Sequence, residues 1–164
     1  MPRTLITPIA DAESRQLAVG VWTAARLATG RTPSAARTER VAAKVHARVE
    51  AGDTALLAHY GDRAAGMLVA EPFRDDGVLD PTCGHLSMLF VDPALWGCGV
   101  GGALVRSLQR GDHGPGWTRL SVWTREENRR ARRLYVARGF VDSGERTSLH
   151  EGEIICRLEW RAGS

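Results

Sequence analysis

The sequence predicts a single mixed α/β (α+β) domain, with helices packed against one sheet. A length of 164 residues is usual for one domain, so we expect residues 1–164 to share one core. Hydrophobic residues make up 43% of the chain and charged residues 25%, as in ordinary globular proteins, which argues against disorder. Strand and helix patterns follow each other in the order βααβββαβαββ, which favours a mixed sheet.

The first half of the chain shows two helices between a strand and a hairpin. Leu17, Val21 and Ala24 recur at helical spacing, and the segment from Thr29 to Pro33 ends that helix. Tyr60-Gly61-Asp62-Arg63 joins two apolar runs, which indicates a hairpin. We expect strands at 4–8, 54–59 and 64–71, helices at 11–28 and 34–52, and a loop at 72–84.

The second half alternates strands and helices around a glycine cluster. His85 to Val91 is the most strand-like segment, and Pro93 ends it because proline cannot donate to a β-ladder. Gly139 ends the last helix as a left-handed residue. We expect further strands at 120–123, 140–146 and 154–160, helices at 100–108 and 128–138, and a loop at 111–116.

The composition argues against several classes of function. No run of about 18 apolar residues occurs, so we expect no membrane partner. The N-terminus lacks the apolar stretch of a secretory signal, so we expect a cytoplasmic protein. The three cysteines and five histidines lack metal-ligand spacing, so no metal is expected. The net charge is only +3 and the basic residues are spread along the chain, so nucleic acid is not an expected partner.

The strongest chemical signal is a glycine cluster between a strand end and a helix start. Four glycines occur in Val91-Asp92-Pro93-Ala94-Leu95-Trp96-Gly97-Cys98-Gly99-Val100-Gly101-Gly102. A backbone without Cβ atoms can turn tightly and point several N–H groups at one spot, and the helix N-terminus adds partial positive charge. This combination predicts a phosphate-binding loop.

Two better-known phosphate loops do not fit this cluster. A Walker loop requires Gly-Lys-Ser/Thr, and the region contains no lysine. Gly97, Gly99 and Gly102 match the G-x-G-x-x-G spacing of dinucleotide-binding loops. That loop, however, follows the first strand of its domain, and this one follows a hairpin in the middle of the chain.

The cluster resembles the coenzyme A loop of the GCN5-related N-acetyltransferase (GNAT) superfamily. The family pattern Gln/Arg-x-x-Gly-x-Gly/Ala is read here as Trp96-Gly97-Cys98-Gly99-Val100-Gly101, with Trp96 where Gln or Arg is usual. A second stretch, Asn128-Arg129-Arg130-Ala131-Arg132-Arg133-Leu134-Tyr135-Val136-Ala137-Arg138-Gly139-Phe140, is similar to the family's N-x-x-A-x-x-L-Y-x-x-x-G-F. The resemblance runs from residue 54 to about residue 160, and the helices at 11–51 fit by position alone.

The resemblance implies a GNAT acyl-CoA N-acyltransferase fold, with a mostly antiparallel sheet splayed near its centre. It implies an N-acetyltransferase that moves the acetyl group of acetyl-CoA to a primary amine in a ternary complex. Acetyl-CoA would lie between the strands at 85–91 and 118–123, and a backbone N–H of Leu89 or Phe90 would polarise its carbonyl. The implied cofactor-binding residues are Leu89, Phe90, Val91, Gly97, Cys98, Gly99, Val100, Gly101, Gly102 and Asn128, with Arg129 or Arg133 as a partner for the 3′-phosphate.

The resemblance also implies two catalytic residues. Tyr135 corresponds to the family tyrosine that protonates the departing sulfur. One family position for the general base is here Trp123, and another is His85, whose pKa near 6.5 suits a base at neutral pH. Strand alternation places His85 on the same face as Leu89 and Val91. Other candidates are Glu71, His59 and His150, and no base is needed if the acceptor amine has a low pKa.

The expected partner is a small-molecule amine. In this family the acceptor contacts residues that correspond to 22–35, 72–84 and 144–152 here. These segments predict a cationic acceptor through Asp75, Asp76, Asp80, Glu145 and Glu151. Alternatives are an acyl-CoA-binding module without turnover, a protein or peptide N-acetyltransferase, and a donor other than acetyl. A homodimer is a further expectation of the family.

Overall fold

The computed structural model describes residues 3–149 and 152–163, and its elements follow the predicted order. The strands and helices are β1 (Thr4–Pro8), α1 (Ala12–Ala28), α2 (Ala35–Glu50), β2 (Thr54–Tyr60), β3 (Arg63–Asp75), β4 (Val78–Val91), a 3-10 turn η1 (Pro93–Leu95), α3 (Val100–Arg110), β5 (Arg119–Arg125), α4 (Arg129–Ala137), β6 (Val141–Ser148) and β7 (Ile154–Arg161).

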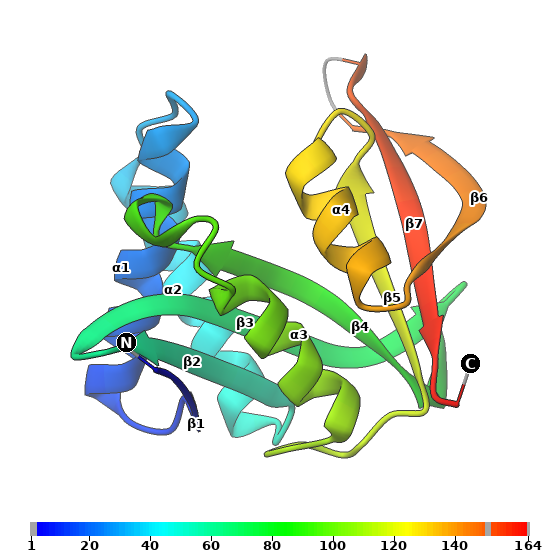
Figure 1. Ribbon diagram of the computed structural model, residues 1–164, viewed down its shortest axis with the longest axis horizontal. Coiled ribbons are helices and arrows are strands. Elements are labelled where there is room, and N and C mark those ends of the chain that lie inside the picture. Colours follow the sequence, from blue (N-terminus) through cyan, green and yellow to red (C-terminus); the bar gives the residue numbers. More distant parts are fainter. Residues whose placement is uncertain (1–2, 150–151, 164) are drawn as a thin grey trace.

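One seven-stranded sheet organises the fold, in the strand order β1-β2-β3-β4-β5-β7-β6. Every neighbouring pair is antiparallel except β4 and β5, which are parallel. Figure 1 shows α3 and α4 in front of the sheet and α1 and α2 behind it. The structure therefore confirms a mixed, mostly antiparallel sheet with helices on both faces.

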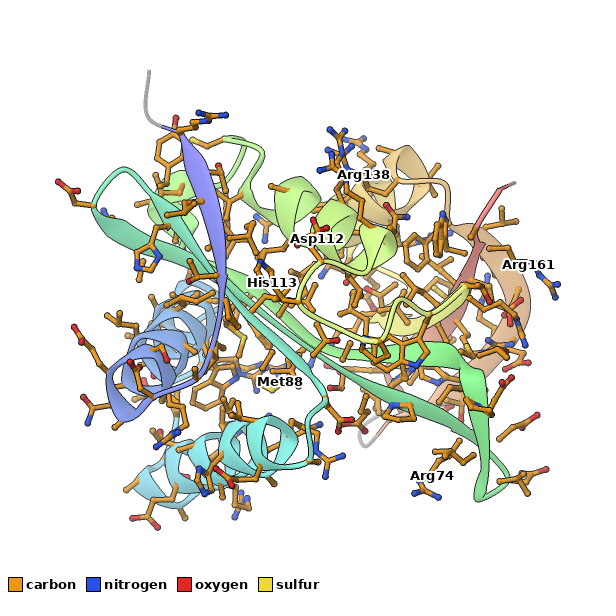
Figure 2. All side chains as sticks on the ribbon, turned by 90° about the horizontal axis from the view of Figure 1, so that it is seen from below. Arg74, Met88, Asp112, His113, Arg138 and Arg161 are labelled. Carbon is orange, nitrogen blue, oxygen red and sulfur yellow. The ribbon has the colours of Figure 1, made fainter. Side chains whose placement is uncertain are left out.

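Two apolar clusters hold these layers together. The cluster under α3 and α4 is centred on buried residues such as Leu68, Leu104 and Leu120. The cluster under α1 and α2 contains Val45 and Met88, and Figure 2 shows Met88 between the sheet and the α1–α2 layer. None of the described helices has the length and apolarity needed to cross a bilayer.

The sheet opens between β4 and β5. The two strands pair only from Cys83 with Arg119 to Leu86 with Val122. Beyond that point β4 continues to Val91 and β5 to Arg125 without pairing with each other. Figure 1 shows the two strands diverging there. The predicted splay therefore lies at the expected strands, and it separates the sheet into two limbs.

The segment expected to be a loop at 72–84 is instead a β-hairpin. β3 extends to Asp75, β4 begins at Val78, and the turn between them contains Asp76 and Gly77. The register shifts next to Pro72, so this proline lies at an interruption of the ladder, where its missing N–H is tolerated. The prolines indicated a loop because a sequence does not show where a strand is bulged.

Candidate active site

A cavity of about 680 Å³ lies where β4 and β5 separate. Its lining comes from the glycine cluster, α3 and α4 on one face of the sheet and from the C-terminal turn of α1 on the other, so the cavity passes through the splay. Of the predicted cofactor residues, those that line it are Leu89, Phe90, Val91, Gly97, Gly99, Val100, Gly101, Gly102 and Asn128.

Polar contacts fix the chain at the start of the glycine cluster. Asp92 ends β4, and its carboxylate accepts a hydrogen bond from the Arg63 guanidinium (Nη2 to Oδ2, 2.6 Å) and another from the Ala94 N–H (3.0 Å). The Trp96 indole Nε1–H donates to the Val91 carbonyl at 3.0 Å. These bonds tie the cluster to the ends of two strands, so its backbone groups are held in place before a ligand binds.

The glycine cluster leaves a row of unpaired donors. Gly97 and Gly99 both have a φ of +83°, in the left-handed region that side chains disfavour, and a Cβ on either would meet no atom within 4 Å. The N–H groups of Gly99, Val100, Gly101 and Gly102 have no hydrogen-bond acceptor among the described residues. Several free donors at a cavity wall suit the pyrophosphate of coenzyme A.

Gly101 and Gly102 are glycines for a different reason. A Cβ on Gly101 would lie 2.6 Å from Cδ1 of Leu134, and one on Gly102 would lie 2.6 Å from Nη2 of Arg138. Both contacts come from α4, so these two glycines let α3 and α4 approach closely; Figure 2 shows Arg138 beside α3. The motif therefore shapes the cavity wall as well as the donor row.

Cys98 does not share the position of its neighbours. Its side chain is exposed and does not line the cavity, and its N–H donates to the Leu95 carbonyl at 3.2 Å. The structure therefore does not support the prediction that Cys98 binds the cofactor.

Arg130 places a positive charge beside the glycine cluster, which we call the cofactor cradle, and the sequence alone did not indicate this residue. The Arg130 guanidinium stacks on the Trp96 ring, with Cζ 3.3 Å from the ring centroid, and both residues line the cavity. Arg133 also lines the cavity, whereas Arg129 does not. Trp96 occupies the motif position where the family usually has Gln or Arg, so a positive charge is restored there from α4.

Leu89 presents a free backbone N–H to the cavity. The Asp92 N–H donates to the Ala65 carbonyl at 2.8 Å, and hydrogen-bonded pairs alternate along an antiparallel ladder. The Phe90 N–H is therefore directed to Met67 on β3, and the Leu89 N–H points the opposite way, toward the splay. Of the two donors that the resemblance proposed, the geometry favours Leu89.

A β-bulge at Ser87 corrects the expected face of His85. Val69 pairs with Met88 and Ala70 with Leu86, so Ser87 is an extra residue in β4. Leu86 and Leu89 consequently both face the α3–α4 cluster, which places His85 on the other face, toward α2. The prediction that His85 shares a face with Leu89 and Val91 is therefore wrong, because strand alternation is broken between them.

His85 lies next to the cavity without lining it. Its Nδ1 is 3.4 Å from the Ser121 hydroxyl, and its ring centroid is 5.9 Å from that of Phe73. Burial lowers the pKa of His85, so the imidazole is neutral at neutral pH. Among the other base candidates, Glu71 lies 3.8 Å from Arg48 outside the lining, His59 is also outside it, and His150 falls outside the described residues.

Tyr135, the predicted proton donor, lies at the cavity wall. It is 5% exposed, and its ring lies 5.4 Å from that of Phe140. Its hydroxyl forms no hydrogen bond with a described residue, and the side chain lines the cavity. Burial raises the pKa of Tyr135, so the phenol is protonated and can donate a hydrogen bond to a group in the cavity.

Asn128 combines a structural role with a place in the cavity. Its side-chain oxygen accepts the Ala131 N–H at 3.1 Å and caps α4. Because this bond uses the oxygen, the amide NH₂ is left to donate into the cavity that Asn128 lines.

The charges of the cavity are all positive. Among the described residues no carboxylate and no imidazole lines it, whereas the guanidinium-bearing lining residues are Arg26, Arg125, Arg130, Arg133 and Arg138. No group of three or more potential metal-ligating side chains occurs in the described part of the chain.

The acidic residues expected to receive a cationic acceptor lie elsewhere. Asp75 and Asp76 are at the β3–β4 turn, Asp80 pairs with Arg119, and Glu145 pairs with Arg157, none of them lining the cavity. Glu151 falls outside the described residues. None of the described acidic residues therefore contributes to the cavity, and Asp80 and Glu145 are already paired with arginines of the protein.

Comparisons with known proteins show the family of the chain. The acetyltransferase (GNAT) family matches residues 22–140, and the chain belongs to this family. No curated protein matches the sequence.

Solved acetyltransferases share the fold over nearly the whole chain. An N-acetyltransferase from Staphylococcus aureus superposes with a TM-score of 0.76 at 14% identity, over 97% of this chain and 98% of that one. The protein yncA from Salmonella typhimurium, solved with its cofactor acetyl-CoA, gives 0.73 at 20% identity, over 96% and 93%. The ribosomal-protein-S18-alanine N-acetyltransferase of Escherichia coli gives 0.70 at 16% identity, over 97% and 94%. At these identities the likeness establishes the GNAT fold.

Proposed function

We propose that this acetyltransferase moves the acetyl group of acetyl-CoA to a primary amine of a small molecule, by direct attack in a ternary complex. The observation that carries the proposal is the single cavity through the splay, which joins the unpaired glycine donors, the free Leu89 N–H and the Tyr135 hydroxyl. Each is a group that acyl transfer from a thioester requires.

Acetyl-CoA supplies an activated thioester when bound. Gly99 to Gly102 offer N–H donors to its pyrophosphate, and Arg130 adds a positive charge beside them. The Asn128 amide is placed to donate to the pantetheine arm. Together these groups hold the cofactor along α3 and α4, with its reactive end directed into the splay.

Leu89 and Tyr135 act on the reacting atoms. The Leu89 N–H donates to the carbonyl oxygen, which becomes negative as the amine attacks, and a fixed backbone donor stabilises that charge without reorganising. The Tyr135 hydroxyl donates to the departing sulfur, which takes the proton as the carbon–sulfur bond breaks. The tyrosinate then recovers a proton from the amine nitrogen by way of water.

The acceptor amine loses its proton without a base in the cavity wall. Arg26 and Arg125 line the side away from the cofactor cradle, and neighbouring positive charges lower the pKa of an ammonium group. A larger fraction of bound acceptor is therefore neutral and nucleophilic near pH 7. His85, held neutral behind the cavity, remains a proposed base that would act through water.

A small acceptor is favoured over a peptide by a contact across the two limbs. Arg31, between α1 and α2, pairs at 3.3 Å with Glu153 at the start of β7, which belongs to the other limb. A peptide substrate needs an open groove at this place, and the ion pair narrows it. The cytoplasmic location and the homodimer stay predictions.

The experiment is thiol release from acetyl-CoA with a panel of amines, amino acids and short peptides, together with calorimetric binding of coenzyme A. We expect turnover with small amines, and about a 100-fold lower kcat in Tyr135→Phe with unchanged coenzyme affinity. In His85→Ala a lowered kcat would support the imidazole as base. Coenzyme binding without turnover on any amine would favour the binding module, and faster turnover on peptides would favour the protein N-acetyltransferase. Absence of coenzyme binding would overturn the proposal.

A further inference from the structure

A cluster of arginines surrounds the side of the cavity away from the cofactor cradle. Arg26, Arg31 and Arg37 line a second cavity of about 210 Å³ at the connection between α1 and α2. Arg26 also lines the main cavity, together with Arg125 from β5. The two cavities therefore share Arg26, and four guanidinium groups, from α1, the α1–α2 connection, α2 and β5, lie around this point.

This cluster is not neutralised within the described protein. Glu153 pairs with Arg31 at 3.3 Å and with Arg125 at 3.1 Å. The guanidinium groups of Arg26 and Arg37 form no ion pair with a described carboxylate. Burial lowers the pKa of Arg26, and repulsion from Arg37, Arg31 and Arg125 lowers it further. Among the described residues, four arginines therefore share the single carboxylate of Glu153.

The position of the cluster assigns it to the acceptor. α1 packs on the face of the sheet that carries Met88, whereas the glycine donors and Arg130 lie with α3 and α4 on the opposite face. A ligand that fills the cradle reaches this side only with its reactive end, through the splay. The group that the arginines meet is therefore part of the second substrate.

We infer, on the basis of the proposed function, that the acceptor is an amine carrying a negatively charged group, a carboxylate or a phosphate, which Arg26 and Arg37 bind while the amine faces the thioester. Guanidinium groups bind both anions through paired N–H donors. The same arginines repel an ammonium group, so they favour the neutral form of the amine at the other end of the acceptor. Placing the binding charge in the acceptor also explains why the cavity lining has no carboxylate among the described residues.

The first test compares amines that differ only in the acidic group, at saturating acetyl-CoA. The pairs are O-phosphoethanolamine with ethanolamine and β-alanine with β-alaninamide, which separate phosphate from carboxylate. We expect kcat/KM to be at least about tenfold higher for one charged member, since charge-assisted hydrogen bonds are strong. Arg26→Gln should lower that value about tenfold through KM, and it should affect the neutral amine much less, only through the pKa of the bound ammonium group. Arg110→Gln, an exposed change of equal charge that lines neither cavity, should alter neither.

The second test measures anion binding without turnover. Inorganic phosphate and glutarate are titrated calorimetrically into the protein saturated with coenzyme A, so that the cofactor cradle is filled. We expect one of the two anions to bind, about tenfold more weakly to Arg26→Gln and equally to Arg110→Gln.

The two tests fail in different ways. If no amine is acetylated but anion binding depends on Arg26, the proposed acetyl transfer is wrong and the anion site stands. If neutral amines are acetylated as fast as charged ones, the inference is overturned and the acetyl transfer stands. A loss of coenzyme affinity in Arg26→Gln equal to the loss for the anion would also overturn it, because the arginines would then serve the cofactor.

Discussion

The two ends of the cavity are built in different ways. At the cofactor end the binding groups are backbone N–H donors of one continuous segment, Gly99 to Gly102. At the acceptor end they are side chains from α1, the α1–α2 connection, α2 and β5. A backbone cradle leaves a local pattern in the sequence, because its glycines lie within one short segment, whereas residues that form a side-chain cluster can be far apart in the chain. The cofactor site can therefore be predicted from a sequence motif, whereas the acceptor site can be inferred only from the structure.

The largest effect is expected where the backbone itself binds. Gly99→Val places a β-branched residue at a φ of +83° and displaces the first donors of α3. We expect coenzyme A affinity to fall by about 100-fold or more, since several charge-assisted hydrogen bonds are lost together.

Gly77→Val is the matched control for this substitution. Gly77 has a φ of +79° at the β3–β4 turn and lies outside both cavities. It should destabilise the fold to a similar degree and leave calorimetric coenzyme affinity unchanged. An equal loss of affinity in both variants would mean that Gly99 acts through folding alone.

The next effect concerns the Arg130 side chain beside the glycine donors. Arg130→Ala removes the guanidinium stacked on Trp96, and we expect about a tenfold loss of coenzyme A affinity that shrinks as salt is added. Arg129→Ala changes the charge one residue earlier, outside the cavity lining, and should have little effect. Equal losses in the two variants would show that the net charge of α4 matters and the stack does not.

A smaller effect is expected on the pH dependence of turnover. Positive charge lowers the pKa of a bound ammonium group, so kcat should rise with pH along a limb below the pKa of the free amine. Arg125→Gln should move this rising part of the pH–rate profile to higher pH, which lowers kcat a few-fold at pH 7. If the rising part of the pH–rate profile stays in place in Arg125→Gln but disappears in His85→Ala, His85 is the base.

The smallest effect concerns stability. His85 has a lowered pKa in the folded protein, so as the pH falls through about 6.5 the unfolded chain takes up a proton before the folded one does. The free energy of unfolding should therefore decrease on acidification, and less so in His85→Gln. The exposed His46→Gln should behave like the wild type in thermal melts at pH 7.5 and 5.5. An identical acid sensitivity in His85→Gln and the wild type would contradict this cause.

Much of the cofactor end could be predicted from the sequence because it depends on local spacing. Gly97 to Gly102, Asn128 and Tyr135 lie in two short motifs, and the structure brings them to one cavity. The bulge at Ser87 could not be predicted, because it depends on the register with β3, and it moved His85 to the other face. Arg26, Arg37 and Arg125 are far apart in the chain, so only the packing of α1, α2 and β5 shows that they meet.

The measurement that tests this division most directly is a crossed calorimetric titration of Gly99→Val and Arg26→Gln. Each variant is titrated separately with coenzyme A and with the charged amine that the wild type acetylates. The two-ended cavity predicts that Gly99→Val loses affinity for coenzyme A and keeps affinity for the amine, and that Arg26→Gln does the reverse. Parallel losses for both ligands in both variants would contradict it.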